Sequence, residues 1–374
     1  MSGIYLHIPF CKSKCSYCNF CSIATLKHKT DFLKALENEL QYSSKNIAEI
    51  EFSSIYFGGG TPSILNYNEI QNIFEVLYKH YKFTKNCEIN FEANPEDLSS
   101  EYLKNLINTP INRLSIGLQS MDDEILKLLR RRHNAERSIN SVIEAYNIGF
   151  ENISVDVIYG INGLSSENFE NHLKIICKLP INHISAYHLE IEKGTLLYKM
   201  LNENKISVID ETLSFKHYNT LIDTLQSFDF EQYEISNFAK NKKVSHHNSS
   251  YWDRSIYYGF GPSAHSFDGK QRFYNTTNIQ DYISEGLKNN FFVEYDKLNE
   301  SDIINEYLML NLRTSKGINL EDYQHCFGNS ELSRLKTKVS KLNQDWFNLA
   351  ENFLSFTREG MFVSNHILIN LFVE

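Results

Sequence analysis

Short apolar runs alternate with longer amphipathic stretches through the first half of the chain. The runs cover residues 4–8, 54–57, 87–92, 113–117, 153–159 and 183–189. Runs of this length, rich in β-branched residues, predict buried strands, while the stretches between them carry apolar residues at helical spacing. Six strand–helix units in succession favour an α/β fold built on a partial (β/α)6 TIM-like barrel, open rather than closed.

Polar residues that can cap a helix precede the amphipathic stretches. They are Asp31, Asn66 or Asn68, Ser100, Asn134 and Ser166. Such side chains accept hydrogen bonds from the free amides of a first turn, so we expect a helix to begin at each of them.

The alternation weakens after residue 189. We expect a helix near 211–225, a short strand at 233–235, and a polar loop at 240–250 before an aromatic, glycine-rich segment. From residue 299, helical stretches at 303–312, 320–326 and 332–342, followed by apolar segments at 353–356 and 361–363, predict a small winged-helix-like α+β domain. The predicted division is a core barrel at 1–236, a connecting segment at 237–298 and a C-terminal domain at 299–374.

Three cysteines follow the first predicted strand within eight residues: Cys11, Cys15 and Cys18. Thiolates at this spacing can bind zinc or an iron–sulfur cluster. Zinc would need a fourth ligand, for which Cys21 is available, but no second cysteine pair or histidine pair follows at finger spacing. A four-iron cluster on three thiolates would leave one iron open to a small ligand, which indicates chemistry rather than electron storage.

Polar residues also stand where the other predicted strands end, and parallel barrels collect functional groups at that face. They are Gly60, Thr61, Pro62, Glu92 and Gln119, with Arg131 at the end of the helix that follows Gln119, while Asp156 lies inside the apolar run 153–158. A buried charge or amide needs a partner, which a polar ligand can supply. A tight turn, a surface carboxylate and a solvated basic turn are the simpler explanations for the glycine loop, Glu92 and Arg131.

Composition narrows the classes of protein further. With 374 residues, 42% of them hydrophobic, the chain can bury a full core. Its 37 basic and 46 acidic residues give a net charge of -9, which offers no electrostatic footprint for nucleic acid. No apolar run approaches the roughly 20 residues of a membrane span. We therefore expect a cytoplasmic protein with no nucleic-acid partner.

The spacing C-x3-C-x2-C behind a strand, with His7-Ile8-Pro9-Phe10 before Cys11, resembles the coproporphyrinogen-dehydrogenase branch of the radical SAM family. The resemblance implies a [4Fe-4S] cluster on Cys11, Cys15 and Cys18 whose free iron takes S-adenosylmethionine (SAM). In that family an electron from the cluster breaks a carbon–sulfur bond of SAM, giving methionine and a 5′-deoxyadenosyl radical. By position the resemblance assigns SAM contacts to Tyr5, Gly60, Thr61, Pro62, Glu92, Gln119, Arg131 and Asp156.

Two features resemble the HemW haem chaperones of that branch more than its oxygen-independent coproporphyrinogen III dehydrogenases. The cysteines begin at residue 11, without the long preceding segment of the dehydrogenases, and Phe20 stands where those enzymes have a fourth cysteine. The run from His247 to Trp252 also matches the HNxxYW motif linked to haem binding. The resemblance thus assigns haem contacts to His247, Asn248, Tyr251 and Trp252, with His265 as a second possible ligand. A polar loop anchored by a half-buried Trp252 explains the run equally simply.

The leading hypothesis is a haem chaperone that uses its cluster and SAM to regulate or drive haem transfer. The implied partners are haem and acceptor haemoproteins of respiration, with association at the periphery of membrane respiratory complexes and a homodimer as further states to test. The alternative is radical SAM oxidative decarboxylation of coproporphyrinogen III, and a zinc module is the third hypothesis.

Overall fold

Six parallel strands form the centre of the computed structural model, which describes residues 2–47 and 49–373. They are β1 (Ser2–Ile8), β2 (Glu51–Gly59), β3 (Lys82–Ala93), β4 (Arg113–Gln119), β5 (Ile153–Tyr159) and β6 (His183–His188). Each pairs in parallel with the next in chain order. The prediction of a partial (β/α)6 barrel is therefore confirmed.

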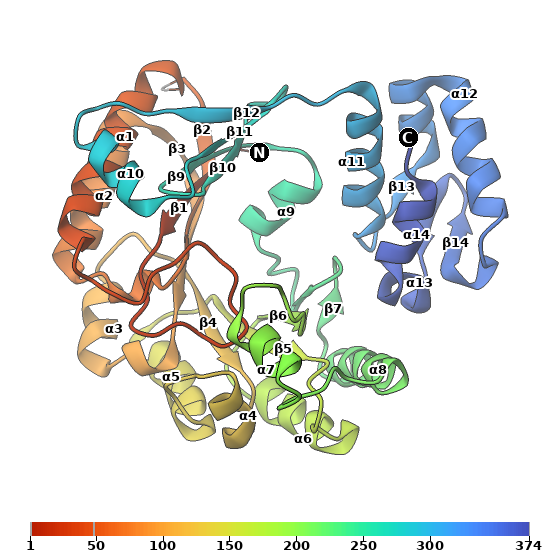
Figure 1. The fold of residues 1–374 in the computed structure, drawn as a ribbon, viewed down its shortest axis with the longest axis horizontal. Helices are drawn as coiled ribbons and strands as arrows, with labels where there is room; N and C mark the ends of the chain where they lie inside the picture. Colours follow the sequence, from red (N-terminus) through yellow and green to blue (C-terminus); the bar gives the residue numbers. More distant parts are fainter. Residues whose placement is uncertain (1, 48, 374) are drawn as a thin grey trace.

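The helices between these strands lie around the outside of the sheet (Figure 1). They are α1 (Lys29–Ile47), α2 (Tyr67–His80), α3 (Ser100–Leu106), α4 (Asp123–Leu128), α5 (Ala135–Ile148), α6 (Ser166–Cys177), and, after β6, α7 (Leu196–Asn202) and α8 (Glu211–Ser227). Alternate residues of β1, such as Ile4, Leu6 and Ile8, are fully buried in the resulting apolar core. Because side chains alternate across a strand, the other face of β1 turns Tyr5 and His7 into the barrel.

The expected caps are correct at Asn66, which forms a capping box, and at Asn134. They are wrong by one residue at α3 and α6, where Ser99 and Ser165 cap in place of Ser100 and Ser166. Each helix is preceded by two adjacent serines, and the first of them has the extended backbone that a cap needs. The sequence alone does not tell which of two adjacent serines is the cap. Asp31 lies inside the first turn of α1, where its charge suits the positive end of the helix dipole.

Residues 237–298 extend the main sheet at both edges. The strand β8 (Asn237–Ala239) pairs with β6 and with β7 (Glu231–Gln232), while β9 (Ile256–Phe260) runs parallel to β1. Beyond β9 lie β10 (His265–Phe267), β11 (Arg272–Asn275) and β12 (Val293–Asp296), with α10 (Ile279–Gly286) between the last two. The expected division of the chain at residues 236 and 298 stays a prediction.

Two expectations for this region are wrong. Residues 233–235 form the connection between β7 and β8 and not a strand of their own, with the Tyr233 amide donating to the Asn237 carbonyl. The polar loop expected at 240–250 gives way at residue 246 to the helix α9 (His246–Trp252), whose first turn is capped by Ser245. A serine cap followed by polar residues starts a helix without apolar periodicity, so the pattern gave no signal.

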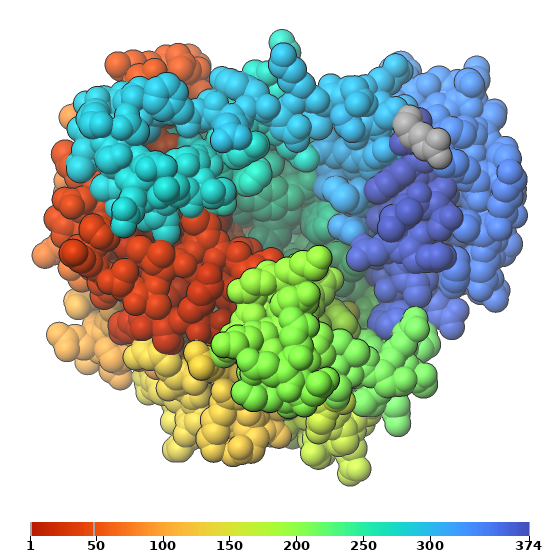
Figure 2. Space-filling view, viewed as in Figure 1, coloured from red at the N-terminus to blue at the C-terminus, as the bar shows by residue number. Residues whose placement is uncertain are grey.

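The C-terminal domain lies beside the barrel, and the molecule is hollowed between the two on the face in Figure 2. It contains α11 (Glu300–Leu312), α12 (Leu320–Ser340), α13 (Arg358–Phe362), α14 (Ser364–Leu371) and a small sheet of β13 (Ile318–Asn319), β15 (Phe353–Phe356) and β14 (Phe347–Ala350). The two helices expected at 320–326 and 332–342 are halves of α12, kinked at Gly328. Buried Glu306 on α11 joins the domain to the barrel side through ion pairs with Arg254 and Arg272.

No helix among the described residues is long and apolar enough to cross a membrane.

Candidate functional site

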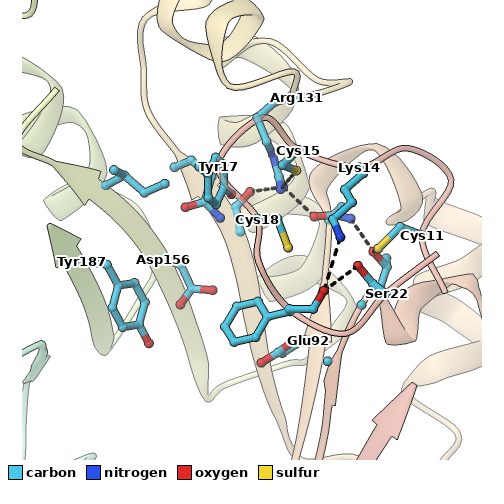
Figure 3. A pocket seen from close by; sticks show the side chains of 18 of the residues that line it. Cys11, Lys14, Cys15, Tyr17, Cys18, Ser22, Glu92, Arg131, Asp156 and Tyr187 are labelled. Carbon is cyan, nitrogen blue, oxygen red and sulfur yellow. Dashed lines mark hydrogen bonds between the residues drawn. The ribbon is translucent and has the colours of Figure 1, made fainter. Parts of the chain in front are cut away.

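A cavity of about 560 Å³ opens at the carboxyl ends of the parallel strands, beneath the loop that carries the cysteines (Figure 3). Ten of the predicted site residues line it: Cys11, Cys15, Cys18, Gly60, Thr61, Pro62, Glu92, Gln119, Arg131 and Asp156. They come from five different strand–helix units, so the fold collects into one place residues that are far apart in the sequence.

The cysteine loop is held by its backbone while its thiols face the cavity. The Ser16 amide donates to the Leu129 carbonyl at 3.1 Å, and the Leu197 amide donates to the Ser16 carbonyl at 2.9 Å. Cys11 Sγ accepts a hydrogen bond from Thr61 Oγ1 at 3.3 Å, and burial raises the pKa of the Cys11 thiol. A cationic centre bound by this thiol would favour its ionised form.

Three thiols on one loop can supply the three protein ligands of an iron–sulfur cluster. Thiolates on one zinc stand about 4 Å apart, because each lies about 2.3 Å from the metal, whereas each thiolate of a cluster binds its own iron. No group of three or more His, Cys, Asp or Glu side chains in the described ranges is arranged to hold a single ion. Cys21, the fourth ligand that zinc would require, donates its thiol to the Thr277 carbonyl at 3.3 Å and does not line the cavity.

Arg131 reaches from the segment after α4 to the cysteine loop, as Figure 3 shows. Its Nη2 donates to Asn94 Oδ1 at 2.5 Å and to the Gly117 carbonyl at 2.8 Å, and its Nη1 to Cys15 Sγ at 3.4 Å. Its Nε is buried and has no hydrogen-bond partner in the part of the chain that the structure describes. An orphaned buried donor on a cationic side chain that lines a cavity fits an anionic ligand group.

Two carboxyl groups lie deeper in the cavity, Glu92 on β3 and Asp156 on β5. Burial raises the pKa of Glu92 to about 7, although the Tyr56 hydroxyl donates to Glu92 Oε1 at 2.7 Å and favours the charged form. Burial likewise raises the pKa of Asp156 to about 6, with Ser115 Oγ donating to Oδ1 at 3.2 Å. Both groups would ionise fully beside a bound cation, and their hydrogen-bond capacity suits ribose hydroxyls.

The backbone at two positions is specialised. Gln119 ends β4 with a φ of 65°, a left-handed conformation that is uncommon for residues other than glycine and is found disproportionately at functional sites. A Cβ at Gly60 would come within 2.8 Å of the Ile8 carbonyl and 2.7 Å of the Phe10 carbonyl. The segment before the cysteines therefore packs against Gly60 too closely for any side chain, and the assignment of Gly60 to SAM stays a prediction.

The predicted haem residues do not line this cavity. His247, on α9, is 1% exposed and fills the amino-terminal half of the barrel, next to Gly3 of β1. Its Nδ1 bonds Ser54 Oγ and its Nε2 bonds the Tyr251 hydroxyl, both at 3.0 Å, and its ring stacks on Tyr56 at 4.9 Å. Burial lowers the pKa of His247 to about 3, so the imidazole is neutral with both nitrogens engaged.

The remaining predicted residues are also spread apart. Tyr5 lies inside the barrel, where its hydroxyl bonds His7 Nδ1 at 3.0 Å. Asn248 and Trp252 are partly buried on α9, and His265 is exposed on β10, with its ring stacked on Tyr274. Their assignments to SAM or haem stay predictions.

Sequence reasoning missed two residues that position the predicted ones. Tyr56 holds Glu92, and Asn94 holds Arg131. Tyr56 could have been found, because the period of two along β2 places Ser54, Tyr56 and Gly58 on the inner face. Asn94 carried no such signal, since it follows β3 in a polar turn whose direction depends on the tertiary fold.

Comparison with known proteins gives matches over the whole chain. A family model described as "Radical SAM superfamily" matches residues 5–176, and one described as "HemN C-terminal domain" matches residues 298–363. The chain is 30% identical over 372 residues to "Heme chaperone HemW" of Bacillus subtilis, with 98% of each protein covered. It is 28% identical to "Radical S-adenosyl methionine domain-containing protein 1, mitochondrial" of Danio rerio, with 100% of this chain and 87% of the relative covered.

A solved structure of coproporphyrinogen III oxidase (HemN) from Escherichia coli superposes on this chain with a TM-score of 0.85. The alignment covers 100% of this chain and 90% of that one at 22% identity. The two proteins therefore share a fold.

Proposed function

Because the chain belongs to the radical SAM superfamily, and within it to the family of the haem chaperone HemW, we propose that it is a haem chaperone. In this proposal it holds a [4Fe-4S] cluster and SAM, binds haem, and passes haem to acceptor haemoproteins. The observation that carries the proposal is the similarity to a named haem chaperone over 98% of both proteins, together with a cavity that fits the superfamily's cofactors.

Cys11, Cys15 and Cys18 would hold the cluster, and the cavity beside them would hold SAM. When bound, the cluster and SAM supply one-electron reductive chemistry. Arg131 would bind the carboxylate of SAM, for which its orphaned Nε is available. Glu92 and Asp156 would accept hydrogen bonds from its cationic or hydroxyl groups, and Gln119 lines the same wall.

The chain's own residues also prepare this cavity before a ligand arrives. The Tyr56 hydroxyl orients the Glu92 carboxyl, and Asn94 with the Gly117 carbonyl fixes the Arg131 guanidinium. Held groups lose little freedom on binding, so their interactions contribute more to affinity. The walls exclude bulk water from the two carboxyl groups, which is why their pKa values rise.

The finer parts of the proposal concern where the haem goes. We propose a cytoplasmic protein that delivers haem to respiratory haemoproteins at the periphery of membrane complexes, either as a monomer or as a homodimer.

Hemin titration of the full chain, reconstituted without oxygen with iron and sulfide, tests the proposal. We expect near-visible absorbance of a cluster, a shifted Soret band on hemin addition, and transfer of that band to an apo-haemoprotein added afterwards. Cys15→Ala should remove the cluster, whereas Cys326→Ala, at an exposed cysteine of α12, should leave it. A colourless protein with stoichiometric zinc would refute the cluster, and conversion of coproporphyrinogen III with SAM and a reductant would replace chaperoning by decarboxylation.

A further inference from the structure

A second cavity, of about 580 Å³, lies beside the first at the carboxyl end of the barrel. The loop after β5, the end of β6, the helix α7 and residues 205–209 enclose it. Most of its lining side chains are apolar, including Leu128, Ile161, Leu197, Leu201 and Val208. A volume of this size with apolar walls and few polar groups is typical of a site for a mostly apolar small molecule.

His188, the last residue of β6, and Leu189 line both cavities. The His188 ring stands edge-on to the Tyr159 ring, with centroids 5.2 Å apart, and its Nε2 bonds Ser214 Oγ of α8 at 2.8 Å. Gly160 makes room for it, because a Cβ there would collide with the imidazole. The ring is therefore fixed in place by its neighbours.

The other nitrogen of this ring is available. Over residues 2–47 and 49–373, nothing forms a hydrogen bond with His188 Nδ1, and His188 is an exposed residue that lines both cavities. A neutral imidazole whose Nε2–H is bonded keeps a lone pair on Nδ1. A neutral imidazole with one nitrogen anchored and the other open is the arrangement that histidine ligands of metals have in proteins.

His247, by contrast, is closed on both sides. Ligation of iron by His247 would break its bonds to Ser54 or Tyr251 and pull α9 out of the barrel, where His247 is 1% exposed. His247 could bind iron only after a rearrangement of α9, whereas His188 could bind iron without one.

We propose that the second cavity binds haem and that His188, through Nδ1, is the axial ligand of its iron. This inference rests on the proposed function, since it names the place of the cargo. The apolar walls would cover the porphyrin faces, and Lys205 at the rim, now paired with Glu203 at 2.8 Å, could exchange that partner for a propionate. Haem held there would share His188 and Leu189 with the SAM cavity.

The test compares two porphyrins on the reconstituted full chain. Hemin can be ligated, whereas metal-free protoporphyrin IX fits the same cavity without ligation. His188→Ala should weaken hemin binding about tenfold or more and abolish its low-spin spectrum, and added imidazole should restore that spectrum. Binding of metal-free protoporphyrin IX, followed by fluorescence, should change less than about twofold. Leu201→Trp, which fills the cavity and spares His188, should weaken binding of both porphyrins.

His246→Ala, on the exposed residue beside His247, and His247→Ala are the matched controls, and both should keep the wild-type hemin spectrum. Iron and sulfide content reports whether each variant still folds around its cluster. A wild-type spectrum in His188→Ala, its loss in His247→Ala, or unchanged porphyrin binding in Leu201→Trp would overturn the inference. Failure of the wild-type chain to bind hemin at all would instead reject the proposed function.

Discussion

Replacement of Glu92 by glutamine should stabilise the empty protein, and the gain should grow with pH. The carboxyl group is buried, and its pKa rises from an ordinary value of 4.5 to about 7 on folding. A raised pKa in the folded state means that folded protein binds the Glu92 proton more tightly than unfolded protein does. The stability of the folded state therefore falls as pH rises from 4.5 through 7. Glutamine cannot ionise, so the variant avoids this loss.

The size of the effect follows from the two pKa values. Their difference of about 2.5 corresponds to about 3 kcal/mol in the free energy of unfolding at pH 8, because one pKa unit is about 1.4 kcal/mol. At pH 5 the unfolded group is only partly ionised, and the cost falls below about 1 kcal/mol. The gap between variant and wild type should thus widen by about 2 to 3 kcal/mol between these pH values.

Urea unfolding of cluster-free protein at pH 5 and pH 8 measures the difference in free energy of unfolding between Glu92→Gln and wild type directly. Asp156, which titrates in both proteins, largely cancels in the subtraction. Glu101→Gln, on the exposed side of α3, is the matched control and should change the free energy of unfolding by no more than about 0.5 kcal/mol. A gap for Glu92→Gln that stays constant between the two pH values would refute the reasoning, since a packing change does not titrate.

Three further predictions follow from contacts in the structure. Arg131→Lys should lower the affinity for SAM about 10- to 100-fold in equilibrium dialysis, since lysine cannot bond Asn94 and a carboxylate in the fork geometry of arginine. Arg358→Lys, at an exposed arginine that does not line the cavity, should leave the affinity unchanged. Gly60→Ala should cost about 1 to 3 kcal/mol by overpacking against two carbonyls, visible as a lower thermal midpoint; an unchanged midpoint would contradict the crowding. Glu306→Gln should loosen the C-terminal domain and speed its cleavage in limited proteolysis, because two arginines lose their buried partner; equal cleavage rates would show that apolar packing alone holds the domain.

The parallel strands could be predicted from the sequence because helices and adjacent strands bury them on all sides. A strand covered by helices outside and by other strands on each side reads as a continuous apolar run, and the predicted bounds of β5 match the structure. The helix α9 could not be predicted in this way. The residues it buries are His247 and Ser250, and their burial depends on polar partners such as Ser54, 193 residues away from His247 in the chain.

The same contrast applies to the site. Glu92, near the end of β3, and Asp156, in the middle of β5, could be predicted because a charge in an apolar run demands an explanation. Their supporting partners were harder to find. The period of two along β2 places Tyr56 on the inner face, but only the register of the sheet puts Tyr56 and Ser115 beside a carboxyl group. His188 was missed for a similar reason, because its availability depends on Ser214 of α8 holding one nitrogen and on nothing holding the other.

The cysteine loop is hydrogen-bonded to two residues that also line the second cavity. Ser16, between two of the cysteines, bonds the Leu128 carbonyl through its hydroxyl at 2.7 Å and accepts from the Leu197 amide at 2.9 Å. Leu128 and Leu197 are also walls of that cavity. A ligand that moves the backbone at either residue would therefore disturb a hydrogen bond to the cysteine loop. Because such coupling is reciprocal, any change that orders the loop through these bonds would alter the affinity of the second cavity for that ligand to the same degree.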